Sequence, residues 1–240
     1  MKWLCTLALA GACLHAHAHD LITAEAAERY LAQAQAQGAV IASREPPARR
    51  AEASLALGRM LDEIRDLLNR DIAMHGKVQG LPSNYLVAEL RSKGAPLAFA
   101  QNRFLANVSY YREALKLAPD GPAAAEASLR WMRGAFYDSF DDDPLVAHGQ
   151  SPEALREQLA LCERFVQRYA DHPEIEEAQF ILLANTVRAA NAATDAGRRA
   201  ALAARAKELG AAFTVRYPDS MRTAAVPVLL EGISAGAPRR

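Results

Sequence analysis

The sequence predicts an all-α fold built from paired helices. Apolar residues recur at helical spacing after residue 20, and no stretch shows the sustained alternation of a half-buried strand. A block of residues in the last third of the chain occurs twice, 48 residues apart, which is typical of a helical repeat. The 28 Lys and Arg balance the 28 Asp and Glu, so we expect no nucleic-acid partner.

Residues 1–18 predict a signal peptide. One lysine precedes an uncharged apolar run over residues 3–14, which is shorter than the roughly 20 residues that a membrane-spanning helix needs. The small residues Ala16 and Ala18 then form an A-x-A cleavage pattern. We therefore expect a periplasmic protein that begins at His19.

A second processing route is an alternative. Residues 9–13, Leu-Ala-Gly-Ala-Cys, resemble a permissive bacterial lipobox, in which Cys13 would be lipidated. The protein would then be an outer-membrane lipoprotein, and we expect membrane association only in that case. Either route leaves Cys162 as the one thiol of the mature chain, so we expect no intramolecular disulfide. We expect Cys162 to be a buried residue on an apolar helix face.

Residues 19–95 are expected to form an irregular N-terminal helical region. Thr23 can cap a first helix that runs to Gly38. A proline-containing linker leads to a long second helix, which ends at Gly76. The apolar stripe of this second helix is formed by Leu57, Met60, Leu61, Ile64, Leu67 and Leu68.

Further helices are expected on both sides of residue 95. Ser83 is the expected N-cap of a short helix that ends at Gly94. Pro96 suits the first turn of the next helix, which ends in the turn at residues 119–122. Two more helices are expected before and after the acidic loop 141–143. The apolar positions of the helix after Pro96 are Phe104, Val108, Tyr111 and Leu115.

The repeated block defines most of the remaining chain. Each copy is expected to be a helix, a tight turn and a second helix, and a weaker copy runs from Tyr110 to Met132. Such helix pairs bury their apolar faces by stacking on one another. We therefore assign residues 96–233 to repeats and residues 234–240 to a tail. The block Leu161, Phe165, Arg168, Tyr169, Asp171 and Leu182 recurs as Leu209, Phe213, Arg216, Tyr217, Asp219 and Leu230.

Two parts of this region resemble the tetratricopeptide-repeat (TPR) proteins of bacterial envelopes. Residues 111–119, Tyr-Arg-Glu-Ala-Leu-Lys-Leu-Ala-Pro, resemble the end of a standard repeat. Residues 213–224 resemble the signature of periplasmic coordinator and barrel-assembly-type repeat proteins. The residues that match this signature are Phe213, Arg216, Tyr217, Pro218, Asp219, Ser220 and Ala224. The resemblance implies a TPR-like α-solenoid. It also implies an adaptor or scaffold that holds an envelope protein or peptide in a concave groove.

Aromatic residues are the candidate contacts for such a partner. Neighbours on a helix point about 100° apart, so the pairs Tyr110–Tyr111 and Phe136–Tyr137 cannot both face the core. One member of each pair is expected to line the groove, because exposed aromatic residues are favoured interface anchors. The candidate partner-binding residues are Tyr110, Trp131 and Tyr137.

Metal handling at the N-terminus is the alternative function. Cleavage after residue 16 would leave His17 first and His19 third, where an amine, two amides and an imidazole suit Cu(II) or Ni(II). Cleavage after residue 18 would leave His19 first, and a second histidine would be needed. The sequence has no G-x-S-x-G, P-loop or dinucleotide-binding glycine pattern. We therefore expect neither an enzyme nor a bound cofactor.

Overall fold

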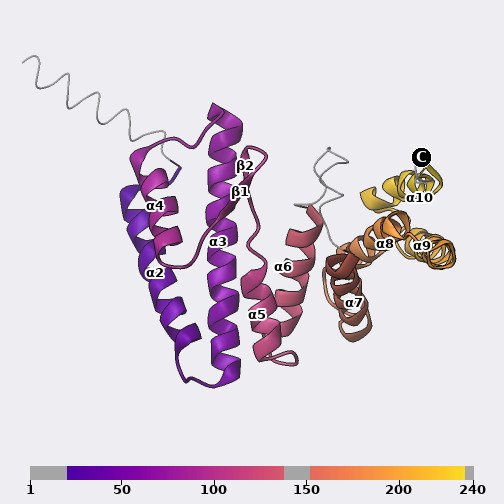
Figure 1. The fold of residues 1–240 in the computed structure, drawn as a ribbon, viewed down its shortest axis with the longest axis horizontal. Coiled ribbons are helices and arrows are strands. Elements are labelled where there is room, and N and C mark those ends of the chain that lie inside the picture. The colour runs from indigo at the N-terminus through magenta and orange to yellow at the C-terminus, as the bar shows by residue number, and fades with distance from the viewer. Residues whose placement is uncertain (1–20, 138–151, 236–240) are drawn as a thin grey trace, which may run out of the picture. The chain divides into compact units, whose positions relative to one another are not determined.

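The computed structural model describes residues 21–137 and 152–235 of the chain. Apart from one two-stranded hairpin and a short 3-10 helix, the regular structure in these residues is α-helical, which confirms the predicted all-α class (Figure 1). The chain divides into two compact units after Ala124, later than the boundary at residue 95 that the sequence suggests. No helix among the described residues has the length and apolar composition needed to cross a bilayer.

The first unit is built around one long helix. Helix α3 (Pro47–His75) contacts both α2 (Ala24–Ala42) and α5 (Ser109–Leu117), and α4 (Leu81–Ser92) packs on α2. The predicted stripe of α3 faces the core, where it meets residues from α2 and α4. The buried members of this core include Tyr30, Leu31, Leu57, Leu61, Ile64, Leu68, Leu86 and Leu90.

Local sequence signals explain two of the helix ends in this unit. The Oγ1 of Thr23 accepts from the amide of Ala26 at 3.1 Å, so the predicted cap of α2 is confirmed. Gly76 ends α3 as predicted, with a φ of 75° that glycine adopts without strain. The prediction for Ser83 is wrong, because α4 already begins at Leu81 and buries Ser83 inside the helix.

A β-hairpin replaces the helix that was predicted to begin at Pro96. Strand β1 (Ala98–Ala100) pairs antiparallel with β2 (Arg103–Leu105). Gln101 and Asn102 form the two-residue turn, with φ values of 52° and 58°, as in the turns that match the twist of paired strands. Helix α5 therefore begins only at Ser109, and the predicted start is wrong.

The hairpin is fixed to α3 by the side chain of Asn69. Its Nδ2 donates to the carbonyl of Phe104 at 2.8 Å, and its Oδ1 accepts from the amide of Phe104 at 2.7 Å. These two bonds satisfy the outer edge of β2, which would otherwise need a neighbouring strand. The partner lies 35 residues earlier in the chain, so helical spacing around Phe104 gives no sign of it.

The second unit consists of α6 (Ala124–Tyr137), α7 (Pro152–Arg168), α8 (Ile175–Ala192), α9 (Ala196–Arg216), a 3-10 helix η2 (Met221–Ala225) and α10 (Val226–Ala235). Helix α8 contacts α7, α9 and α10, which explains why apolar residues are buried around most of its surface. One core cluster joins α8, α9 and α10 through Leu183, Val187, Ala206, Phe213 and Val226.

The two copies of the repeated block form the same corner between helices. At the end of α7 the amide of Tyr169 donates to the carbonyl of Phe165 at 2.8 Å, and at the end of α9 Tyr217 donates to Phe213 at 2.9 Å. The two rings of each pair lie 5.1 and 5.0 Å apart, tilted by 52° in both copies. The arginine before each tyrosine lies over the tyrosine ring, at 5.5 and 5.4 Å. The recurring residues thus build recurring contacts.

The segment after α5 has the same backbone pattern as these two corners. Its three hydrogen bonds fall within Ala114–Ala124, with N···O distances of 3.0, 3.1 and 3.0 Å. The corresponding bonds lie 51 residues later within 165–175 and a further 48 residues later within 213–223. The weaker sequence copy therefore forms the same turn, with Ala118 in place of tyrosine. An aspartate occupies the same place in each corner, as Asp120, Asp171 and Asp219.

Candidate protein-binding site on α6 and α8

Tyr137, the last residue of α6, is an exposed aromatic side chain in a fixed position. It is 46% exposed, whereas its neighbour Phe136 is buried, so this pair divides between surface and interior as predicted. The two rings meet edge to face, with centroids 5.1 Å apart. The hydroxyl of Tyr137 donates to Oε1 of Glu177 on α8 at 2.9 Å. The ring is therefore held at both its base and its tip.

Arg133 extends this contact along α6. It lies one turn before Tyr137, on the same side of the helix, and its guanidinium donates to the carboxylates of Glu174 and Glu177. Glu177 thus receives one hydrogen bond on each of its two oxygens, from Arg133 and from Tyr137. These bonds connect α6 to the first turn of α8.

The polar network continues to the segment after α9. Arg222 of η2 donates to Oε1 of Glu176 at 3.1 Å, and its other nitrogen lies 3.8 Å from Oε2 of Glu177. The hydroxyl of Ser220 donates to Oε1 of Glu176 at 2.6 Å. Three segments that are distant in the sequence therefore meet at the start of α8. We call Arg133, Tyr137, Glu174, Glu176, Glu177 and Arg222 the Tyr137 surface.

Glu177 is the buried centre of the Tyr137 surface. Burial by itself would raise the pKa of this carboxyl group, but the hydrogen bonds from Arg133 and Tyr137 and the positive charges of Arg133 and Arg222 outweigh it. The net result is a pKa below the ordinary value of a glutamate. Burial, and then the bond to Glu177, raise the pKa of the Tyr137 hydroxyl. Glu177 is therefore ionised and Tyr137 is a neutral donor at neutral pH.

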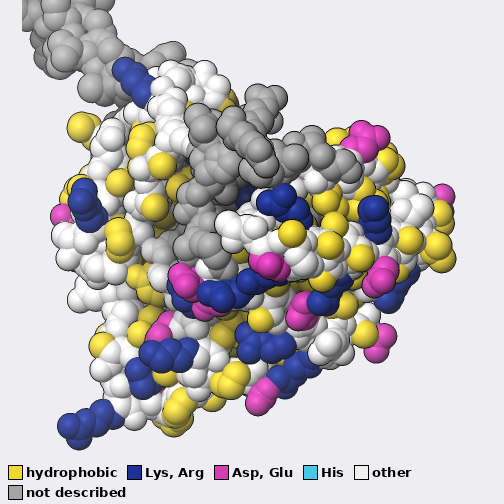
Figure 2. Space-filling model, turned by 45° about the vertical axis from the view of Figure 1, so that its right-hand side comes forward, with side chains coloured by type: hydrophobic (Ala, Val, Ile, Leu, Met, Phe, Trp, Pro, Cys, Tyr) yellow, Lys and Arg dark blue, Asp and Glu magenta, His cyan; other side chains and the backbone are white. Residues whose placement is uncertain are grey.

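This arrangement is suited to binding a partner. A tyrosine with a fixed ring loses little conformational entropy when a partner covers it. The charged groups around it are already paired with one another, so a partner does not need to neutralise a bare charge. Figure 2 shows basic, acidic and apolar side chains intermingled on the face that it displays. The Tyr137 surface is mixed as well, because it joins one aromatic ring with two arginines and three glutamates. Such a surface suits a protein or peptide better than a polyanion.

The other two predicted contact residues are less available. Trp131, one turn and a half before Tyr137 on α6, is only 7% exposed, so its selection as a contact residue is corrected: a buried side chain offers no surface to a partner. Tyr110 is half-buried in the first unit, where it packs against the core and donates to the carbonyl of Gly94 at 3.0 Å. The three residues are therefore not equivalent, and Tyr137 is the best candidate.

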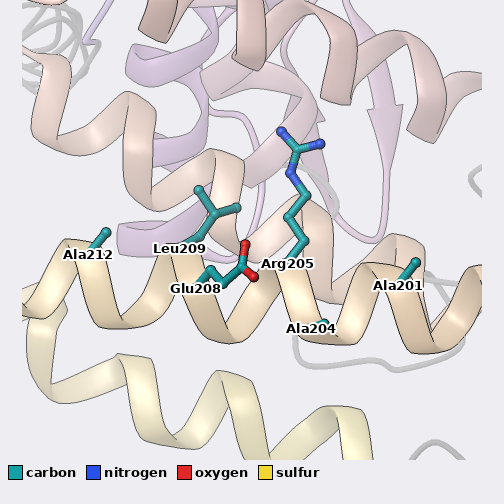
Figure 3. Close-up of a pocket in the computed structure, with 6 residues that line it drawn as sticks. All are labelled: Ala201, Ala204, Arg205, Glu208, Leu209 and Ala212. Carbon is teal, nitrogen blue, oxygen red and sulfur yellow. The ribbon is translucent and has the colours of Figure 1, made fainter.

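A shallow hollow of about 570 Å³ runs along α9. Arg205 and Leu209 extend from the same side of the helix there (Figure 3), and Arg205 is bound to Glu163 of α7 at 2.9 Å. Three alanines also line this hollow, so another chain can approach the helix closely beside them. Its described lining residues are Ala201, Ala204, Arg205, Glu208, Leu209 and Ala212.

The candidate metal and lipidation residues cannot be placed in this site. His17, His19, Cys13 and the acidic loop 141–143 lie outside the described residues. Within residues 21–137 and 152–235, no three His, Cys, Asp or Glu side chains form a group that could hold a metal ion. His75, at the end of α3, is bound through Nδ1 to Asp71 at 2.8 Å, as expected of a histidine at a helix end.

Cys162 is buried between α7 and α8, as the sequence predicts. Burial raises the pKa of its thiol to about 12, although a hydrogen bond from Asn185 partly opposes this. The thiol is therefore protonated at neutral pH, and a protonated buried thiol is a poor nucleophile.

Sequence reasoning did not find Glu177 and Arg222. Glutamates in the first turn of a helix are common and usually solvated, so nothing in the local sequence separates Glu177 from Glu176. The one available signal is the repeat, which brings residues near 174 and 222 to equivalent corners.

The chain matches no protein-family model, no curated protein and no solved structure. Support for its function therefore comes from the geometry of the site.

Proposed function

We propose that this chain is an exported adaptor of the bacterial cell envelope, which binds a protein or peptide partner through the Tyr137 surface. The observation that carries the proposal is an exposed tyrosine ring held between Phe136 and Glu177. Tyrosines of this kind are enriched among the residues that dominate binding energy at interfaces. The signal peptide predicted from residues 1–18 supports a periplasmic location for this adaptor.

The repeated corners support the same proposal. Proteins built from repeated helix pairs typically use an extended surface, to which successive pairs contribute, for binding other proteins. Here the Tyr137 surface is assembled from α6, from the corner before α8 and from the corner after α9. The resemblance to envelope TPR proteins points to the same class of function, with a TPR-like solenoid as the scaffold.

The experiment is an affinity purification of the chain, tagged at its C-terminus, after crosslinking in the native envelope. A roughly stoichiometric partner, identified by mass spectrometry, is the expected result. Replacing Tyr137 by alanine should weaken that association by about tenfold or more, as loss of an interface anchor does. The matched control is Tyr85→Ala in the first unit, because Tyr85 is 48% exposed and also lies beside a glutamate.

Tyr137→Phe separates the ring from its hydroxyl. This variant keeps the aromatic surface and loses the bond to Glu177, so we expect it to retain most of the binding. Equal recovery of the partner by the wild type and Tyr137→Ala would contradict the proposal. Equal losses in Tyr137→Ala and Tyr85→Ala would contradict the assignment of the site.

A further inference from the structure

The β-hairpin of the first unit leaves one strand edge open. The outer edge of β2 is satisfied by Asn69, but within the described part of the chain β1 pairs with β2 alone. All three residues of β1 are exposed. An open edge of this kind is a template for another extended chain.

The hydrogen-bond pattern identifies which groups of β1 point outward. Phe104 directs its amide and carbonyl away from β1, to Asn69. Phe99 is the residue opposite Phe104, so the two form a pair that is not hydrogen-bonded across the hairpin. The amide and carbonyl of Phe99 must therefore point to the open edge. Among the described residues neither group has a hydrogen-bond partner.

An apolar hollow lies on the face of the hairpin that carries these two phenylalanines. The rings of Phe99 and Phe104 are in edge contact, with centroids 4.9 Å apart, and Phe99 is 55% exposed. Both line a hollow of about 510 Å³ between the hairpin and α4. A residue paired with Phe99 on an added strand would place its side chain on this same face. The remaining lining residues are Val78, Val87, Arg91, Pro96 and Leu97.

Arg91 is the one charged side chain among the described residues that line this hollow. It is exposed, and no described residue forms an ion pair with it. A guanidinium at the rim of an apolar hollow is complementary to a carboxylate. The hollow therefore offers an apolar contact and a positive charge beside an open strand edge.

We infer that the first unit binds an extended peptide, which adds to the open edge of β1, places an apolar side chain in the hollow and presents a carboxylate to Arg91. The open amide and carbonyl of Phe99 select an extended backbone, because an incoming helix has no free groups to pair with them. The carboxylate belongs to the C-terminus of the peptide or to an acidic side chain. This site is independent of the Tyr137 surface, which lies in the second unit.

The test is a selection with the purified full-length protein from a displayed library of random short peptides. Apolar sequences with a carboxylate should be enriched on the wild type and not on Arg91→Glu. The enriched peptide is then synthesised with a fluorescent label, and its affinity is measured by anisotropy. Arg91→Gln should weaken binding by about tenfold, through loss of a charge-assisted hydrogen bond. Arg59→Gln, on α3, is the matched control and should leave the affinity unchanged.

Two modified peptides test the binding mode. N-methylation of the peptide amides that face β1 should abolish binding, whereas N-methylation of the alternate amides should change it by less than about twofold, because strand pairing uses every second residue. Amidation of the C-terminus identifies the carboxylate: it weakens binding as Arg91→Gln does if the C-terminus is the ligand, and it has no effect if the ligand is an acidic side chain.

Four results would overturn the inference. The first is that no peptide is enriched on the wild type over Arg91→Glu. The second is that the enriched peptides lack a carboxylate. The third is that binding is equally sensitive to N-methylation of the peptide amides at every position. The fourth is that sedimentation shows a dimer that Phe99→Asp makes monomeric, because β1 would then pair with a second copy of the chain. The behaviour of Tyr137→Ala has no bearing on any of these outcomes.

Discussion

Gly58 and Tyr111 are in such close contact that no larger residue fits at position 58. A Cβ at this position would lie 2.6 Å from Cε1 of the Tyr111 ring. The ring is fully buried, and its hydroxyl donates to Asp62 at 2.5 Å. Gly58 therefore sets the distance between α3 and α5, and Asp62 sets the direction of the ring.

Gly58→Ala should therefore destabilise the protein. Overpacking costs about 1–3 kcal/mol, and the higher helix propensity of alanine recovers up to about 1 kcal/mol. We expect a net loss of about 1–2 kcal/mol in the free energy of unfolding, measured by urea denaturation. Gly38→Ala is the control, since nothing lies within 4 Å of a Cβ there. A gain of stability in both variants would show that the contact with Tyr111 is not as close as described.

Asn69→Ala should loosen the hairpin while α3 stays folded. The substitution removes both hydrogen bonds to the backbone of Phe104, and we expect a local loss of about 2 kcal/mol. Hydrogen exchange at the Phe104 amide should become markedly faster. Asn84→Ala removes a single exposed bond to Gly80 and should leave that amide unchanged. Unaltered exchange of the Phe104 amide in Asn69→Ala would show that the two bonds from Asn69 do not hold the hairpin.

Glu177 should make the stability of the second unit depend on acid pH. Its pKa in the folded protein lies below 4.5, the ordinary value of a glutamate, so the folded state binds the proton less readily than the unfolded chain does. The resulting stabilisation is present above about pH 4.5 and is lost as the pH falls through the folded pKa. Glu177→Gln should therefore be less stable than the wild type at pH 7, by about 2 kcal/mol.

The stabilities of the wild type and of Glu177→Gln should converge as the pH is lowered towards 3. Thermal unfolding measured across this pH range checks the prediction. Glu153→Gln is the control, because Glu153 is exposed and its pair with Arg156, the one pair formed within the described residues, lies at the surface. A constant difference between Glu177→Gln and the wild type at every pH would show that the charge of Glu177 is not the cause.

Cys162 should not react with thiol reagents in the native protein. Its sulfur is buried, and burial raises its pKa to about 12, so neither access nor the thiolate form is available at neutral pH. Ellman's reagent should label the thiol only in denaturant. Rapid labelling of the folded protein would indicate that α7 separates readily from α8.

The helices and the repeat were predictable because their signals are local or periodic. The stripe Leu57–Leu68 fixes the buried face of α3, and Thr23 and Gly76 mark two helix ends. The block around Tyr169 and Tyr217 predicts two equivalent corners, because recurring residues form recurring contacts.

The hairpin and the centre of the candidate site could not be predicted in this way. Phe104 adopts a strand because Asn69, on another element, bonds to its backbone. The turn has no glycine at its positive φ positions, Gln101 and Asn102, so the usual turn signal is missing. Glu177 is the centre of the site because it accepts hydrogen bonds from both Arg133 and Tyr137, which lie 44 and 40 residues away. Helical periodicity contains no information about such contacts.

Site-specific photocrosslinking tests the adaptor proposal most directly. A photoreactive amino acid is placed at Tyr137, and in a parallel variant at Tyr85, and the cells are irradiated with the envelope intact. The proposal predicts that one envelope protein is crosslinked at position 137 and not at position 85. If position 137 yields no crosslinked protein, or only the products that position 85 also yields, then the Tyr137 surface is not a partner-binding site.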